Sequence, residues 1–336
     1  MTADCGRPQR GRPTRAHTAA VNFYGELLLS RRDALARGAT DAEIKAALAR
    51  CEIAVVRRGI YVPAAVLESL DATGRHLLEV RATLLASAPA AAAAHGSAAL
   101  VHGMSLWRVP ERVHLGIPRS SGGHVGRHRH VHADGLTERD VDVIDGLRCT
   151  SAARTVADLA RTLPFEDAVC AGDSALNRHL VTPESVRESL SRTPSHRRRT
   201  AAECVLGFLD GRSESVGESR SRVYLHHLGV PCPELQVTLM LSDRRTTFRP
   251  DFLWEDEGVI GEFDGVSKYS ALARPGESPA DVLVREKRRE DLLRAHGWTV
   301  VRWTWSDLTS PQLGRELRRV LAAGCGGARP RTTRVG

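Results

Sequence analysis

Two acidic stretches in the last third of this 336-residue chain decide how we interpret its fold: Arg249-Pro250-Asp251-Phe252, and Val259-Ile260-Gly261-Glu262-Phe263-Asp264-Gly265. Both are apolar runs of strand length that carry carboxylates. Successive side chains of a strand point to opposite faces, so Glu262 and Asp264 are expected on one face and Phe263 on the other. If the two strands are neighbours, Asp251 joins them. The sequence then predicts three carboxylates at one edge of a sheet.

The segments around these stretches predict a domain with the element order αβββαβ. Gly229 is a typical signal for the end of the first helix, because glycine readily adopts the left-handed conformation found there. The expected elements are a helix over 216–228, strands over 234–241, 247–254 and 259–265, a helix over 281–295 and a strand over 299–305.

Three carboxylates this close repel one another unless a cation or protons neutralise them. Hard oxygen ligands of this kind suit Mg²⁺ or Mn²⁺. We predict that Asp251 and Glu262 bind the metal, that Asp264 supports them, and that Glu218 adds a ligand from the first helix. Such a metal would activate a water for phosphodiester hydrolysis. The alternative is a set of buried acids that neighbouring arginines, such as Arg249, Arg285 or Arg302, neutralise.

The charge of the chain indicates a polyanionic partner. Its formal net charge is +8 and its pI is about 9.5, which favours nucleic acid, with DNA as the first candidate. Only three of the 48 basic residues are lysines, so a lysine indicates a place where an ammonium group is wanted. We predict that Lys268 orients the attacking water. The predicted nucleic-acid contacts are Lys45, Arg57, Arg58, Arg220, Arg222, Lys287 and Arg289.

Five sequence pieces of the C-terminal third resemble the PD-(D/E)xK nuclease superfamily, and within it the branch grouped with very-short-patch-repair (Vsr-like) endonucleases. The pieces are ESRSR (218–222), RPDFLW (249–254), VIGEFDG (259–265), REKRREDLLRAHGW (285–298) and VVRWTWSDL (300–308). The resemblance implies a restriction-endonuclease-like fold and a Mg²⁺-dependent endodeoxyribonuclease, a hydrolase. One departure is clear: Asp264 stands where the superfamily has its lysine. Lys268 or Lys287 is our candidate to replace it.

The pattern of residues 21–68 is typical of a winged helix-turn-helix. A helix is expected over 24–37, and a second helix is expected to begin with Thr40 or Asp41 as its cap. Residues 53–63 then predict a hairpin that turns at Arg58-Gly59. In such a fold the second helix enters the major groove and the wing meets phosphates. The alternative is a small helical cap that contacts only protein.

Residues 75–190 predict an α+β domain, and the front half as a whole resembles AbiEi-type antitoxins of actinobacteria. The pieces that carry the resemblance are RRGIYVP (57–63), AAHGSAALVHG (93–103), RVHLGIPR (112–119) and CTSAARTVADLAR (149–161). It implies a DNA-binding, autoregulatory front half and a cognate toxin as a possible partner. The expected elements are helices over 89–104, 151–163, 165–179 and 182–190, and strands over 112–118, 128–133 and 141–149.

Seven histidines fall in this middle region: His95, His102, His114, His124, His128, His130 and His132. The last three alternate, so a strand would place them on one face. A metal site is one interpretation. We favour an exposed polar strand or loop instead, because no carboxylate or cysteine stands nearby at ligand spacing.

The remaining segments complete an α/β multidomain architecture. Residues 1–20 are expected to be a disordered basic arm, 191–211 a helical linker, 212–320 the nuclease-like domain and 321–336 a disordered tail. The sequence has no apolar run of membrane-spanning length and no secretory signal. Its seven scattered cysteines form no CxxC pair, which favours a reducing cytoplasm.

These observations lead to two hypotheses about function. The first is a DNA-binding protein with a Mg²⁺-dependent endonuclease domain. The second is a non-enzymatic AbiEi-type antitoxin or transcriptional autoregulator, whose degenerate nuclease-like domain binds DNA or a partner protein. RNA is an alternative substrate in the first hypothesis, because metal-dependent hydrolysis of a phosphodiester does not distinguish ribose from deoxyribose.

Overall fold

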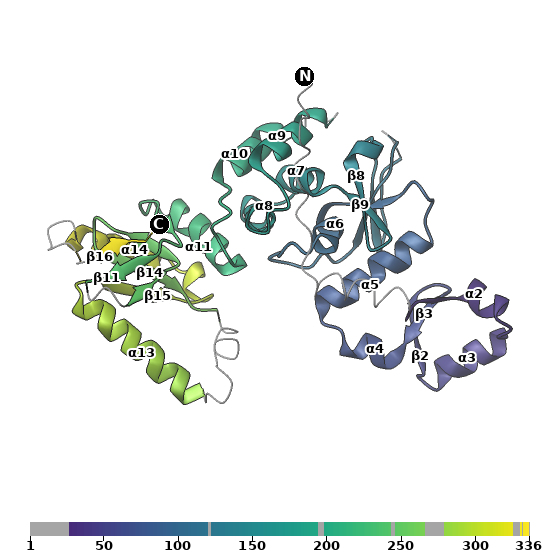
Figure 1. Ribbon diagram of the computed structural model, residues 1–336. Coiled ribbons are helices and arrows are strands. Elements are labelled where there is room, and N and C mark those ends of the chain that lie inside the picture. The colour runs from purple at the N-terminus through teal and green to yellow at the C-terminus, as the bar shows by residue number, and fades with distance from the viewer. Residues whose placement is uncertain are drawn as a thin grey trace, which may run out of the picture. The chain divides into compact units, whose positions relative to one another are not determined.

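The computed structural model describes residues 27–119, 122–193, 198–242, 246–265, 279–324, 330 and 332–335. It is a mixed α/β protein whose chain divides into two compact units, Met1–Gly211 and Arg212–Gly336 (Figure 1). None of the helices in these residues combines the length and the apolar character needed to cross a membrane.

The first described elements are two short helices and a small sheet. They are β1 (Leu29–Ser30), α2 (Arg31–Ala36), α3 (Asp41–Ala49), β2 (Ile53–Arg57) and β3 (Ile60–Pro63), with the strand order β1-β3-β2. The predicted cap of the second helix is confirmed: the Thr40 side chain accepts from the Glu43 backbone, and the Glu43 carboxylate accepts from the Thr40 backbone. The hairpin is also confirmed, and Gly59 supplies the positive φ of its turn. The predicted helix over 24–37 is confirmed over α2, but not before it, because β1 pairs with β3 and Ser30 caps a helix that begins only at Arg31.

The middle of the first unit is built on a six-stranded sheet with the order β6-β7-β5-β4-β9-β8. Its elements are α4 (Ala64–Ser69), α5 (Ala72–Leu85), β4 (Ala92–Ala93), α6 (His95–Val101), β5 (Val113–Gly116), β6 (His124–Val125), β7 (Arg129–His132), β8 (Val141–Ile144) and β9 (Leu147–Thr150). Two predictions are wrong here. The alanine-rich helix over 89–104 is a strand followed by a short helix, and the strand over 141–149 is a hairpin.

Four helices follow this sheet: α7 (Ala152–Thr162), α8 (Phe165–Asn177), α9 (Pro183–Arg192) and α10 (Arg199–Phe208). Helix α7 lies at their centre and packs against α6, α8, α9 and α10 (Figure 1). Ser151 caps α7 and Thr182 caps α9, as the sequence predicts. The helices over 151–163, 165–179 and 182–190 are therefore confirmed to within a few residues.

The second unit contains a four-stranded sheet, β10-β13-β14-β15, and a three-stranded sheet, β12-β11-β16. Its elements are α11 (Val216–His227), β10 (Glu234–Leu235), β11 (Leu239–Leu241), β12 (Thr247–Phe248), β13 (Phe252–Trp254), β14 (Val259–Phe263), α13 (Pro279–Ala295), β15 (Thr299–Trp303), α14 (Pro311–Gly324) and β16 (Thr332–Arg334). The predicted order of elements is present, but each of the first two predicted strands divides into two.

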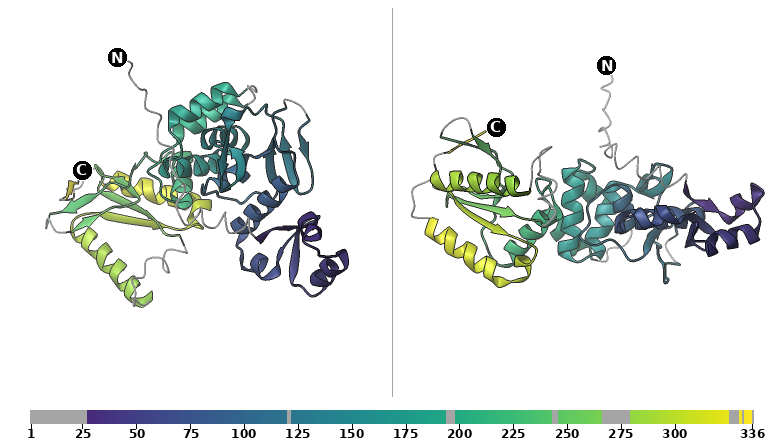
Figure 2. Two further views of the ribbon diagram at one scale, coloured as in Figure 1. Left: turned by 45° about the vertical axis from the view of Figure 1, so that its right-hand side comes forward. Right: turned by 90° about the horizontal axis from the view of Figure 1, so that it is seen from below.

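Two apolar cores cover the two faces of the four-stranded sheet. Phe252, Phe263 and Trp303 face side chains of α11 and α14. Leu253 and Ile260 face Leu293 of α13 and the small sheet. Helices α13 and α14 accordingly lie on opposite sides of the strands in the right-hand view of Figure 2. The acidic residues lie at the end of this sheet, both faces of which are covered by apolar cores.

Candidate active site in the C-terminal unit

The acids predicted from the sequence come from three neighbouring elements. Glu218 lies in the first turn of α11, Asp251 directly precedes β13, and Glu262 lies in β14. Strands β13 and β14 are antiparallel with Phe252 opposite Gly261, so the residues before and after this pair, Asp251 and Glu262, are neighbours. The Asp251 carboxylate (Oδ2) accepts a hydrogen bond of 2.9 Å from the Phe263 backbone N–H, which fixes the carboxylate against β14.

Gln236 joins two of these acids, and the sequence gives no signal for its role. Its side-chain amide nitrogen (Nε2) lies 3.0 Å from Glu218 Oε2 and 3.3 Å from Asp251 Oδ1. The residue also has a positive φ of 54°, a conformation that costs a non-glycine residue roughly 1–2 kcal/mol. A strained residue at a cluster of charged groups is a frequent property of functional sites.

Glu262 is buried and held by two arginines. Its oxygens lie 3.2 Å from Arg289 Nη2 of α13 and 2.8 Å from Arg302 Nη2 of β15. Arg302 is directly opposite Glu262 in the parallel pairing of β14 and β15. The same guanidinium lies 3.4 Å from Asp264 Oδ2 and 3.2 Å from Glu290 Oε2. Glu262 and Asp264 therefore share one face, as strand parity predicts, and Arg302 links them.

Burial makes the charged forms of these acids costly. Desolvation raises the pKa of Glu218, and the nearby Asp251 raises it further. Desolvation also raises the pKa of Glu262; Arg289 and Arg302 oppose this effect, whereas Asp251 and Asp264 add to it. Repulsion among carboxylates at a buried edge is the condition under which a bound cation stabilises a site.

Carboxylates are the ligands that a hard divalent cation such as Mg²⁺ prefers. Within the described ranges, no three of these acids bring one oxygen each within 4.8 Å of the others. Mg²⁺ nevertheless is often held by only one or two carboxylates, completed by water and substrate phosphate oxygens. Asp251 and Glu262 are the pair that would hold it, with Glu218 beside Asp251. Lys268, the predicted water-orienting group, lies outside the described residues.

The predicted nucleic-acid contacts of this unit lie on two helices. Lys287 is exposed on α13, while Arg220 and Arg222 are half-buried on α11. The Arg220 guanidinium carbon lies 5.7 Å from the ring centroid of Trp305. Arg289 is half-buried, and its guanidinium pairs with Glu262. Both helices thus carry cationic side chains, and one of these, Arg289, pairs with a carboxylate of the acidic cluster.

The predicted contacts of the first unit differ in exposure. Lys45 is exposed on α3, and Arg58 is exposed at the hairpin turn. Arg57 is half-buried, and its guanidinium (Nη1) donates a 2.6 Å hydrogen bond to the Thr83 hydroxyl of α5. Desolvation there lowers the pKa of Arg57. Arg57 therefore ties the hairpin to α5 and does not project from the tip as predicted.

Comparison with known proteins gives relatives without a described activity. No family model matches the chain. The uncharacterised proteins MT2308 and Rv2248 of two Mycobacterium tuberculosis strains are each 28% identical to it over 187 residues, which is 54% of this chain and 66% of theirs. The chain thus spans just under two thirds of these relatives' length. The crystal structure of the RV2827C protein from Mycobacterium tuberculosis aligns with a TM-score of 0.39 and 16% identity, over 64% of this chain and 83% of that one.

Proposed function

We propose that this protein binds DNA and that its C-terminal unit hydrolyses phosphodiester bonds as a Mg²⁺-dependent endodeoxyribonuclease. The observation that carries the proposal is that Glu218, Asp251 and Glu262 lie on neighbouring elements at one sheet edge, where Gln236 bonds to the first two and Asp251 accepts from the backbone beside Glu262. A packed core alone needs no such set, because Glu218 and Glu262 are buried and each costs free energy to desolvate.

The arrangement of elements supports a restriction-endonuclease-like fold of the Vsr-like branch for this unit. Helix α11, strands β13 and β14, helix α13 and strand β15 follow one another in the expected order. In the first unit, α2, α3 and the β2–β3 hairpin support a winged helix-turn-helix of the AbiEi type. Its α3 would enter the DNA groove with Lys45, and Arg58 at the turn would meet a phosphate. A cytoplasmic location fits this function.

Each acid of the site has a separate task in this proposal. Asp251 and Glu262 would hold the Mg²⁺, which when bound supplies an activated water and stabilises charge on the phosphate. Gln236 orients Glu218 and Asp251 through its amide group. Arg289 and Arg302 favour the ionised form of Glu262 and hold it in place, and Arg302 also contacts Asp264. Lys268 would orient the water in place of the superfamily's lysine.

One observation favours a second candidate function. Both oxygens of Glu262 already have arginine partners, from α13 and from β15. Such pairing neutralises a buried acid without a metal. It supports the alternative of a non-enzymatic antitoxin or autoregulator whose nuclease-like unit binds DNA or a partner protein, a cognate toxin among them.

A plasmid-nicking assay with Mg²⁺ or Mn²⁺ decides between the two. We expect wild type to nick supercoiled DNA and the Asp251→Asn variant to be slower by about 100-fold or more, on the scale of losing one group that stabilises the transition state. Asn keeps an oxygen that accepts the Phe263 N–H, so the fold is preserved. Asp291→Asn, an exposed carboxylate on α13, is the matched control and should cleave like wild type.

Two further outcomes are informative. If wild type cleaves neither DNA nor RNA with either metal, the nuclease proposal fails and the regulator remains. If Lys268→Met cleaves as fast as wild type, Lys268 has no part in the reaction.

A further inference from the structure

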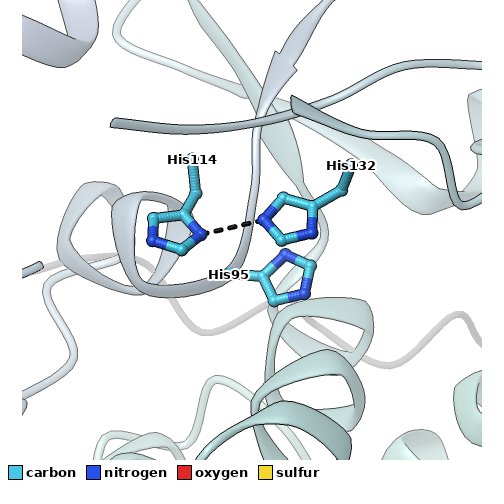
Figure 3. Close-up of side chains that lie close together, drawn as sticks. All are labelled: His95, His114 and His132. Atoms are coloured by element: carbon cyan, nitrogen blue, oxygen red, sulfur yellow. Dashed lines mark hydrogen bonds between the residues drawn. The ribbon is translucent and has the colours of Figure 1, made fainter. Parts of the chain in front are cut away.

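Three histidines that are distant in sequence meet in the middle of the first unit (Figure 3). His114 lies in β5, His132 lies in β7, and His95 begins α6. Strands β5 and β7 are parallel, with His114 opposite His130 and Gly116 opposite His132. The side chains of His114, His130 and His132 therefore share one face of the sheet. One ring nitrogen each of His95, His114 and His132 lies within 4.8 Å of the other two.

Their ring geometry is that of a compact group. His114 Nδ1 and His132 Nε2 are 2.9 Å apart. The His95 ring stacks on that of His132 with centroids 3.7 Å apart. This is not the exposed polar strand that we predict from the sequence. Sequence spacing does not reveal this group, because its third member, His95, belongs to a helix and lies 19 residues before His114.

His95 itself has no structural explanation in a metal-free core. Its side chain is buried, and its Nδ1 has no hydrogen-bond partner within the described part of the chain. A buried polar atom without a partner costs about 1–3 kcal/mol. Its backbone φ is +49°, which costs roughly another 1–2 kcal/mol. A ligand for the unpaired nitrogen would offset these costs.

Two carboxylates also lie near His95. Asp134 and Asp158 each bring an oxygen within 4.8 Å of a His95 ring nitrogen and of each other. Asp158 is itself held by Arg154 at 2.8 Å, so its orientation is fixed. Metal-bound histidines commonly donate their second ring nitrogen to a carboxylate of this kind, which fixes the tautomer.

We propose that His95, His114 and His132 bind a zinc-class transition metal ion. Three imidazoles that leave a fourth position for water match the ligands of Zn²⁺ better than those of Mg²⁺ or Ca²⁺, which prefer oxygen. Zn²⁺ binds the neutral imidazole through the ring nitrogen that carries no proton.

The His95 ring, which stacks on that of His132, has to turn so that its nitrogen points at the ion, whereas the change needed at the His114–His132 pair is small. Two nitrogens bound tetrahedrally at about 2.0–2.1 Å are about 3.3 Å apart. The 2.9 Å pair His114–His132 therefore has to open by about 0.4 Å, with a change of tautomer that frees both lone pairs. The bound ion would tie the start of α6 to β5 and β7. It would stabilise this unit by an amount that grows with the logarithm of the free metal concentration above the Kd.

X-ray absorption at the zinc edge of the full-length, untagged wild-type chain, loaded with one equivalent of Zn²⁺, tests the proposal without any variant. We expect about three imidazole nitrogens at about 2.0–2.1 Å. A spectrum with oxygen ligands only, or no Zn²⁺ retained after dialysis, overturns the proposal.

Calorimetric titration of variants with Zn²⁺ then locates the ion. His114→Gln and His132→Gln should each bind about 100-fold more weakly, since removing even an outer-shell partner costs about 10–100-fold. His124→Gln, an exposed histidine on β6, is the matched control and should bind like wild type. Asp251→Asn should also bind like wild type, which separates this site from the acidic cluster. Equal affinity in all four variants contradicts the assignment.

Discussion

The guanidinium of Arg302 lies among three carboxylates at the C-terminal sheet edge. It lies 2.8 Å from Glu262 and 3.2 Å from Glu290, and it also contacts Asp264. The Glu262 side chain is only 9% exposed and that of Arg302 26%. A buried carboxylate that loses one of its two arginine partners keeps only part of its compensation, here from Arg289 at 3.2 Å, and this loss costs more than the removed pair contributes to stability.

Replacing Arg302 should therefore destabilise the C-terminal unit. We expect Arg302→Gln to lower its free energy of unfolding by about 2 kcal/mol, less than the roughly 3–5 kcal/mol of a fully buried pair because Arg302 is partly exposed. Adding Glu262→Gln to that variant should restore about half of the loss, because no charge is then buried alone. Urea denaturation followed by tryptophan fluorescence measures both.

The exposed pair Arg249–Glu214 is the control for this prediction. Its side chains are 47% and 44% exposed, so Arg249→Gln should cost under about 1 kcal/mol. A double variant Arg302→Gln/Glu262→Gln that is less stable than Arg302→Gln alone would show that Glu262 is not the residue that Arg302 stabilises.

The sequence predicts which site residues are neighbours only where those residues lie close together along the chain. Strand parity places Glu262 and Asp264 together because they are two residues apart on one strand. The same parity places His130 with His132. It says nothing of Gln236 or His95, because each meets its partners through tertiary packing. Each also has a positive φ, which no sequence rule predicts for Gln or for a histidine at the start of a helix.

At the scale of elements, the sequence predicts helices with capping signals better than it predicts the strands of the C-terminal unit. The strands expected over 234–241 and 247–254 each divide between the two sheets. The first divides near Gln236, where φ is positive, and the second at Pro250, which has no N–H for strand pairing. Periodicity cannot detect such a division, because the apolar alternation continues through it: Leu235 and Leu239 are both buried, in different cores.

The capping box of α3 gives a prediction at this scale. The Thr40 side chain accepts from the Glu43 backbone, and Glu43 Oε2 lies 2.7 Å from the Thr40 backbone N and 2.8 Å from its hydroxyl. Thr40→Ala should lower the free energy of unfolding of the first unit by about 1 kcal/mol, whereas Thr40→Ser should change it by only a few tenths. Thermal unfolding followed by circular dichroism tests this. Equal losses in the two variants would mean that the hydroxyl does not stabilise the helix.

At the scale of the whole molecule, the two units gather different kinds of polar side chain. The first unit gathers imidazole side chains from β5, β7 and α6, and the second gathers carboxylates from α11, β13 and β14. Each set depends on its own sheet being folded. A chemical probe that reports folding of the first unit is therefore the right control for the assays on its histidines.

The cysteines supply such a probe. Cys149 and Cys170 are buried in the first unit, whereas Cys51, Cys204 and Cys232 are exposed. Burial also raises the pKa of the Cys149 thiol, and the nearby Asp142 raises it further, so little reactive thiolate forms there. We expect alkylation at pH 8, read by peptide mass spectrometry, to modify the three exposed thiols quickly. The buried pair should react slower by about 10³-fold or more, through opening of a fold stable by several kcal/mol.

Denaturation in urea should abolish this difference, because the buried thiols then react as free side chains. The same measurement on the histidine variants separates lost metal binding from failure of the first unit to fold. A variant of the first unit that keeps Cys149 and Cys170 protected but no longer binds Zn²⁺ has lost a ligand and not its core. Rapid alkylation of Cys149 in the native wild type would contradict the packing of α6 against β9, on which the histidine site depends.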